Sequence, residues 1–123
     1  MTPLTITTRS AGTGPVLEVT GDLDHATAPE LRKAVDGLTV AAGQLLVLDL
    51  ARLDFCDSSG ISALLSARSL AIGQGAGMAL ASVPTNTARI LRIVGLDQVF
   101  TIHDDVTAAT ASTTLRVITP GAR

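Results

Sequence analysis

The sequence predicts a single α/β domain in which a mixed β-sheet is combined with about four helices. Three observations lead to this prediction. The length of 123 residues suits one domain. The chain opens with two strand patterns joined by a turn, as in an antiparallel hairpin. Helical patterns then alternate with strand patterns, which is typical of parallel neighbours, and the helices are expected on one face of the sheet or on both.

The first two strands are expected at residues 4–8 and 16–20. Residues 4–8 alternate between apolar and Thr side chains, the pattern of a half-buried strand, and residues 11–15 contain the Gly and Pro of a turn. A helix is expected from Thr27, because the run TAPE at 27–30 matches a capping box with Pro in the first turn. The apolar face of this helix comprises Leu31, Ala34, Val35 and Leu38.

The middle of the chain predicts a central strand followed by a second helix. Residues 45–50 are nearly continuous in branched apolar side chains, as in a strand covered on both faces. A helix is expected from Ser58 or Ser59 to residue 72, because the Gly-rich residues 73–77 then end it. The apolar face of this helix comprises Ile61, Leu64, Leu65 and Ile72.

The last third of the chain continues the alternation. A strand is expected at residues 78–83, a third helix after Pro84, and a short strand at residues 99–102. Asp104 is a candidate N-cap for a last helix that begins at about residue 106. The third helix is expected to bury Ala88, Leu91 and Val94.

No internal repeat or low-complexity linker divides the chain. We therefore expect the folded domain to span residues 1–114. The tail at residues 115–123 ends in Pro-Gly-Ala-Arg, and we expect it to be disordered.

Composition and charge exclude several classes of function. Aromatic residues make up 2% of the chain and the net charge is -2, so the stacking platforms and basic grooves that bind nucleic acid are not expected. No apolar run approaches about 18 residues, so no membrane-spanning segment is expected, and the first residues do not resemble a signal peptide. The single Cys56 is expected to be a small buried hydrophobe, without a disulfide or a metal cluster. A cytoplasmic protein fits these features best.

The segment richest in chemical groups joins the central strand to the second helix, at residues 53–61. Ser58 and Ser59 stand where a helix start offers free backbone N–H groups and the positive end of the helix dipole, so a phosphate would be well received there. The simpler interpretation is that Asp57 and one of the serines only cap the helix. The sequence leaves open which hydroxyl would cap.

A serine hydrolase is a competing interpretation of the same serines. The nucleophile-elbow pattern G-x-S-x-G is absent, and the only imidazoles belong to His25 and His103. His25 follows the second strand, and His103 is expected at a solvated strand end. A Walker-type phosphate loop is absent as well, because the glycines at residues 73–77 are not followed by Lys. Catalysis is therefore disfavoured.

Taken in order, the motifs resemble those of STAS domains of the anti-sigma-factor antagonist type, bacterial regulators that are also called anti-anti-sigma factors. The resemblance covers nearly the whole chain. It rests on GDLD at residues 21–24 with APEL at 28–31, on VLDL at 47–50 leading to FCDSSGI at 55–61, and on IVGL at 93–96.

The resemblance implies a protein without catalytic activity or a cofactor, which binds an anti-sigma factor and so releases a sigma factor for transcription. The anti-sigma factor in this family is usually an ATP-dependent serine kinase that phosphorylates the first serine of the motif, here Ser58. A PP2C-type phosphatase removes the phosphate. The residues that the resemblance implies for partner binding are Gly21, Asp22, Asp24, Ile61 and Ser62.

Phosphorylation of Ser58 would act as a switch. It would add about -1.5 to -2 charges next to Asp57, which the helix start offsets within the fold but a docking partner rejects. With so few aromatic residues, the partner surface is expected to rely on small side chains around Ser58. The alternative is a STAS scaffold or transporter-associated binding subunit that no kinase regulates. The residues adjacent to the phosphorylated serine or capping its helix are Asp57, Ser59 and Gly60.

Overall fold

The computed structural model describes residues 3–111, which form a six-stranded mixed sheet with helices packed on it. The strand order is β1-β2-β3-β5-β6, and β4 pairs with β2. Only the β1–β2 pair is antiparallel, so the predicted α/β class with a mixed sheet is confirmed. The elements are β1 (Thr5–Ala11), β2 (Gly14–Leu23), α1 (Ala28–Asp36), β3 (Leu45–Asp49), β4 (Leu53–Cys56), α2 (Ser58–Gly73), β5 (Gly77–Ala81), α3 (Thr85–Ile93), the 3₁₀ turn η1 (Leu96–Gln98) and β6 (Thr101–His103), followed by helical residues at 106–111.

The opening hairpin is fastened to the start of β3. The amide of Leu45 donates to the carbonyl of Thr13 at 2.8 Å. Gly14 lies at φ 144°, and a Cβ at this position would overlap the carbonyl oxygen of Leu45. Glycine is therefore required where the turn passes against the neighbouring strand.

β4 was not expected from the sequence, which predicted only a junction between the central strand and the second helix. β2 is long enough to pair with β3 along its first half and with β4 along its second half. A tight turn at residues 50–52 separates the two shorter strands, held by the Asp49 carboxylate, which accepts from the Ala51 amide at 3.1 Å. Opposite this turn β2 shifts register after Gly21, whose φ is 102°.

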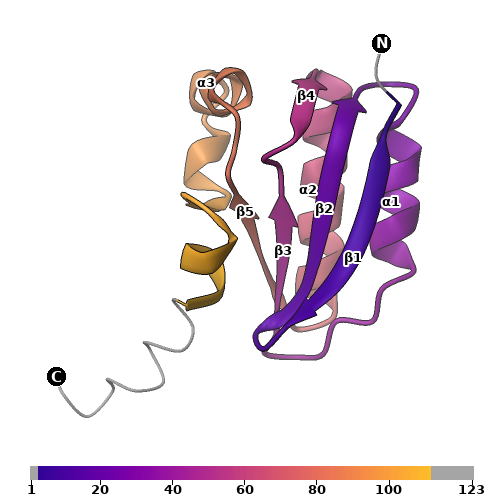
Figure 1. The fold of residues 1–123 in the computed structure, drawn as a ribbon, viewed down its shortest axis with the longest axis vertical. Coiled ribbons are helices and arrows are strands. Elements are labelled where there is room, and N and C mark those ends of the chain that lie inside the picture. The colour runs from indigo at the N-terminus through magenta and orange to yellow at the C-terminus, as the bar shows by residue number, and fades with distance from the viewer. Residues whose placement is uncertain (1–2, 112–123) are drawn as a thin grey trace, which may run out of the picture.

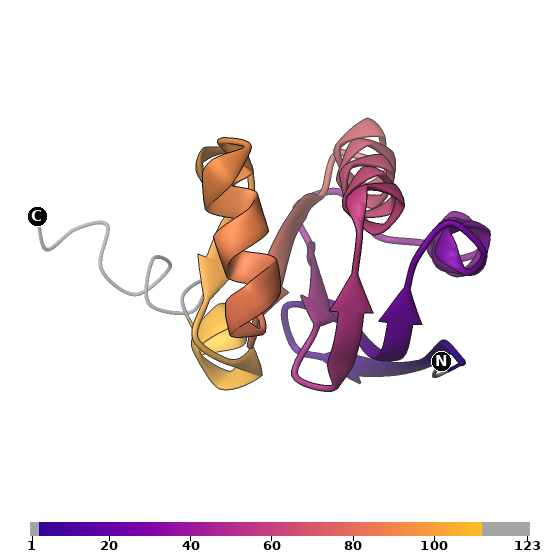
Figure 2. The ribbon, with the colours of Figure 1, turned by 90° about the horizontal axis from the view of Figure 1, so that it is seen from above.

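The helices cover both faces of the sheet unequally. α1 and α2 pack side by side on one face, over an aliphatic core that includes Leu17, Leu48 and Leu64 (Figures 1 and 2). The last helix lies on the opposite face, where Ala109 packs against Val16, Val47 and Ala81 (Figure 2). With no Trp or Tyr in the chain, the described core consists mainly of aliphatic side chains, together with Phe100.

The predicted capping box at Thr27 does not form. Thr27 is the N-cap residue of α1, but its side chain makes no capping hydrogen bond. Its hydroxyl instead donates to the carbonyl of Asp22 at 2.8 Å and accepts from the amide of Asp24 at 2.9 Å. The backbone of Thr27 is already in the helical region, so its hydroxyl faces the preceding loop.

Two predicted core positions are exposed. α3 ends at Ile93, so Val94 falls on the C-cap and is 57% exposed, whereas Leu91 is buried as predicted. Ile72 is 49% exposed because the buried face of α2 runs through Leu64, Ala67 and Ala71, and Ile72 lies beside that face.

The last described helix begins where the sequence predicts, but its cap is one residue later than expected. The carboxylate of Asp105, not that of Asp104, accepts from the amide of Ala108 at 2.8 Å. The predicted boundary after residue 114 and the tail at 115–123 lie outside the described residues.

Candidate functional site

The candidate site lies where β2 and β4 end. The two strands are parallel and place Asp22 opposite Phe55 and Leu23 opposite Cys56. The amide of Asp57 continues the pairing by donating to the carbonyl of Leu23 at 3.3 Å. The loop that begins at Asp24, after β2, therefore lies beside the start of α2 (Figure 1).

Asp57 is the N-cap of α2. Its backbone is extended, and its carboxylate accepts from the amide of Gly60 at 3.1 Å. Ser58 follows as the first helical residue and is exposed, while Ser59 is half-buried. Because Asp57 supplies the cap, neither serine hydroxyl is needed for it.

Gly60 allows α2 to start in close contact with the sheet. A Cβ on Gly60 would lie 2.5 Å from the carbonyl oxygen of Leu23 and 2.7 Å from Sγ of Cys56, closer than van der Waals contact permits. Any larger residue would push the first turn of α2, and with it Ser58, away from β2. Gly60 thus sets the position of the exposed serine.

Cys56 is buried beneath the site, as expected from the sequence. Desolvation by burial, together with the nearby charge of Asp57, raises the pKa of the Cys56 thiol to about 12. A thiol that stays protonated at neutral pH is a poor nucleophile. Burial and the raised pKa of the thiol therefore both favour a packing role for Cys56.

The loop after β2 is ordered by its own polar groups. The carboxylate of Asp24 accepts from the amides of Ala26 and Thr27 at 3.0 and 3.1 Å. Asp22 and Asp24 are half-buried and stand at the same end of the sheet as Asp57. The surroundings of Ser58 are accordingly acidic, although the start of α2 supplies the positive end of a helix dipole.

The predicted partner-binding residues divide into two groups. Asp22, Asp24 and Ser62 are at least partly accessible. Gly21 and Ile61 are buried, because Gly21 sits in the β2–β4 pairing and Ile61 belongs to the core under α2. The structure therefore places these two beneath the accessible surface of the site, and their part in partner binding stays a prediction.

Phe55 is the accessible residue that sequence reasoning missed. It is 52% exposed, near the carboxyl end of β4, and it lines a hollow of about 450 Å³ that continues to the start of α3. The expectation that the partner surface relies on small side chains around Ser58 stays a prediction, but an exposed aromatic side chain stands three residues before that serine. The available signal was the position of Phe55 just before the serine motif, but its exposure depends on packing that the sequence does not reveal.

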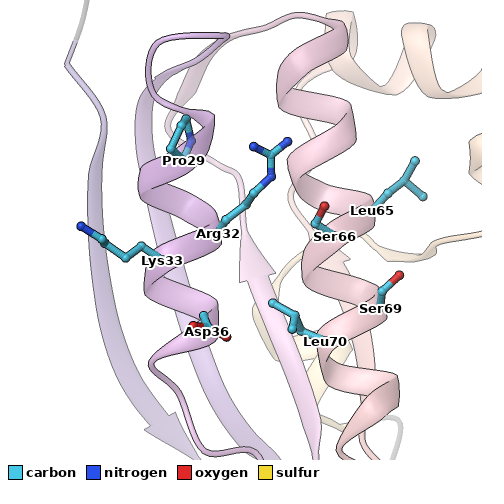
Figure 3. Close-up of a pocket in the computed structure, with 8 residues that line it drawn as sticks. All are labelled: Pro29, Arg32, Lys33, Asp36, Leu65, Ser66, Ser69 and Leu70. Carbon is cyan, nitrogen blue, oxygen red and sulfur yellow. The ribbon is translucent and has the colours of Figure 1, made fainter.

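A second, larger hollow lies away from the serines. It is a groove of about 700 Å³ between α1 and α2, where the side chain of Arg32 lies between the two helices (Figure 3). None of the predicted site residues lines it, so volume alone does not mark the site. The lining residues are Pro29, Arg32, Lys33, Asp36, Leu65, Ser66, Ser69 and Leu70.

The geometry does not favour a hydrolytic triad. The carboxylate of Asp57 accepts from the backbone of its own helix, and none of the hydrogen bonds of the described residues joins it to an imidazole. Within residues 3–111, no three side chains of His, Cys, Asp or Glu gather closely enough to hold a metal ion. The helices of that same region include none long and apolar enough to cross a membrane.

Comparison with known proteins identifies similar chains over most of this length. The family model described as "Mlab, STAS domain" matches residues 6–104. The anti-sigma-F factor antagonist RsfB from Mycobacterium tuberculosis is 31% identical over 108 residues, which cover 85% of this chain and 88% of that protein.

Solved structures with the same fold include regulators and a transporter-related protein. An anti-sigma factor antagonist from Mycobacterium paratuberculosis superposes with a TM-score of 0.77 at 26% identity, covering 89% of this chain and 93% of that one. A sulfate transporter family protein from Wolinella succinogenes reaches a TM-score of 0.71 at 20% identity, covering 83% of this chain and 85% of that one. At that identity the second likeness concerns the fold alone.

Proposed function

The chain belongs to the STAS family of anti-sigma-factor antagonists, and from this premise we propose that phosphorylation of Ser58 controls its binding to an anti-sigma factor. In the unmodified state the protein binds the anti-sigma factor and thereby releases a sigma factor for transcription. The protein itself catalyses no reaction, and its place of action is the cytoplasm.

The observation that carries this proposal is the exposed hydroxyl at the start of a helix whose cap is supplied by another residue. Ser58 is accessible while Asp57 accepts from Gly60, so modification of Ser58 leaves the cap intact. The first turn of α2 also offsets negative charge. A phosphate is therefore compatible with the folded state.

The same phosphate opposes docking. It adds about -1.5 to -2 charges to an end of the molecule that already carries Asp22, Asp24 and Asp57. A partner that packs against a neutral hydroxyl would have to bury this dianion and lose its hydration. Phosphorylation of Ser58 would thus prevent binding while the fold is retained.

The proposed partner is an anti-sigma factor that is also a serine kinase. It transfers the γ-phosphoryl group of ATP to Oγ of Ser58, the hydroxyl proton is lost, and ADP leaves. A PP2C-type phosphatase hydrolyses the phosphoserine and restores the binding surface.

The test uses the anti-sigma kinases encoded in the same genome, purified one at a time and incubated with this protein and ATP. We expect one kinase to add a single phosphate, seen by mass spectrometry, and Ser58→Ala to abolish the mass gain. Ser58→Asp should abolish binding while leaving the thermal midpoint within a few degrees of wild type. Ser69→Ala, about three turns along α2 and also exposed, is the matched control and should be phosphorylated normally.

A mass gain that persists in Ser58→Ala contradicts the assignment of the site. If no kinase binds or modifies the wild type, the alternative of a scaffold or transporter-associated subunit is favoured. Co-purification with a membrane transporter, insensitive to Ser58→Asp, would support that alternative.

A further inference from the structure

The hollow beside Phe55 is formed by two elements far apart in the sequence. β4 pairs with β2 along one edge, and its other side faces the start of α3 (Figure 1). Its lining combines apolar side chains with one charged residue from each element. The lining residues are Asp54, Phe55, Cys56, Pro84, Thr85, Asn86, Thr87, Arg89 and Ile90.

The aromatic ring in this hollow is unusual for this chain. The protein contains two Phe and no Trp or Tyr, and Phe100 is buried. Phe55 is half-exposed. Burial of the exposed part of its ring by a partner would be favourable, because it removes apolar surface from water. Aromatic side chains that border a pocket are enriched among the residues that dominate binding energy.

The hollow and Ser58 are carried by neighbouring residues of the chain. Only Cys56, the last residue of β4, and Asp57, the N-cap of α2, separate Phe55 from Ser58 in the sequence. A protein that docks over Ser58 with an interface of standard size, about 800 Å² on each side, therefore extends over Phe55 as well.

The charges differ across the hollow. Asp54 stands on the β4 side of the hollow, and Arg89 stands on the α3 side. The one ion pair within the described residues joins Arg9 to Glu18, so Asp54 and Arg89 have no such partner there. A basic side chain of a partner would therefore be electrostatically complementary to Asp54, on the β4 side of the hollow.

We propose that this hollow is the apolar half of the anti-sigma-factor docking surface, and that it receives an aliphatic or aromatic side chain of that partner, with a basic residue placed against Asp54. This inference rests on the proposed function. Phe55 determines how tightly the partner docks, whereas Ser58 determines whether docking is permitted. The two roles predict different kinetic effects.

The experiment measures binding and phosphorylation with the purified kinase that modifies the wild type. Phe55→Ala should raise the dissociation constant, and the KM for Ser58 phosphorylation, about tenfold or more, with kcat within twofold of wild type. Phe55→Leu should restore most of the affinity. Ile93→Ala is the matched control, because Ile93 is 75% exposed at the far end of α3, and it should change neither constant more than twofold.

A charge test examines the chemistry of the partner. Asp54→Lys should weaken binding at low salt and reduce its salt dependence, whereas Arg89→Glu should leave affinity unchanged or improve it. If Arg89→Glu weakens the complex and Asp54→Lys strengthens it, the proposal that a basic residue of the partner lies against Asp54 is wrong. Urea midpoints of all variants verify that they are folded.

The outcomes distinguish the two proposals. Wild type that is phosphorylated on Ser58, with Phe55→Ala binding within twofold, overturns the hollow as a docking site and leaves the proposed function standing. Wild type that neither binds nor is modified overturns both. A fall in kcat with KM unchanged would place Phe55 in the positioning of Ser58 instead of in docking.

Discussion

Cys56 shows how a single buried residue supports a site without taking part in its chemistry. Its Sγ would lie 2.7 Å from a Cβ placed on Gly60. The end of β4 and the start of α2 are therefore in direct contact at these two residues. Burial raises its pKa to about 12 from an ordinary value of 9.0. The folded protein therefore holds the thiol neutral over a pH range in which the unfolded chain ionises it.

This difference predicts an alkaline loss of stability. Between pH 9 and about 12 the unfolded state loses the thiol proton and the folded state keeps it, so the free energy of unfolding falls as pH rises and is fully retained below pH 9. The slope contributed by Cys56 is at most about 1.4 kcal/mol per pH unit. Urea denaturation at several pH values should show this slope in wild type and its absence in Cys56→Ala. The chain has no Tyr to titrate in the same range.

At the residue scale, the serine motif was predictable and Phe55 was not. Adjacent serines before an apolar run signal a helix start from local sequence alone, and the structure begins α2 at Ser58. The exposure of Phe55 depends on α3, which comes about thirty residues later and leaves a hollow beside β4. Local pattern carries no information about such a distant neighbour.

At the scale of elements, the start of α2 depends on one carboxylate. Asp57 accepts from Gly60, and no acidic residue follows in the first turn. Asp57→Ala should therefore lower the free energy of unfolding by about 1 kcal/mol. Asp57→Asn keeps an oxygen acceptor and should lose much less.

The same pair of variants separates capping from phosphorylation. If Asp57 only caps, Asp57→Asn should be phosphorylated as wild type is, because the helix start is preserved. The initial rates of phosphorylation of the wild type and of Asp57→Asn by the anti-sigma kinase can be compared by following the mass gain with mass spectrometry. A strong loss of phosphorylation in Asp57→Asn, with stability unchanged, would show that the carboxylate itself presents Ser58.

Helices and strands were predictable where a local sequence pattern is compatible with only one kind of secondary structure. The hairpin, the central strand and the helices follow from alternation and from glycine stops, which are local signals. β4 was missed because its four residues show no clean alternation and are a strand only by pairing with the second half of β2. The capping box at Thr27 failed because the loop before α1 uses the same hydroxyl.

At the scale of the whole molecule, the site and the stabilising contacts are on different parts of the fold. Ser58 and Phe55 lie where β2 and β4 end, whereas the last helix closes the opposite face of the sheet through Ala109. Sequence analysis left open whether helices cover one face or both. Deciding this required the long-range contact between Ala109 and strands formed much earlier in the chain.

This separation predicts that stability can be lowered without loss of the switch. Ala109 is fully buried against Val16 and Val47, so Ala109→Glu either buries an unpaired carboxylate or undocks the last helix. We expect the free energy of unfolding to fall by about 2 kcal/mol or more, measured by urea denaturation, while Thr107→Glu on the exposed side changes it by less than about 0.5 kcal/mol.

At a temperature where Ala109→Glu remains folded, the kinase should modify Ser58 with the KM and kcat of wild type, because Ala109 packs against Val16, Val47 and Ala81, none of which lines the hollow beside Phe55. A raised KM in this folded variant would mean that the two faces of the sheet are coupled. In that case the docking surface would depend on how the last helix packs on the opposite face of the sheet, and not on Phe55 and its neighbours alone.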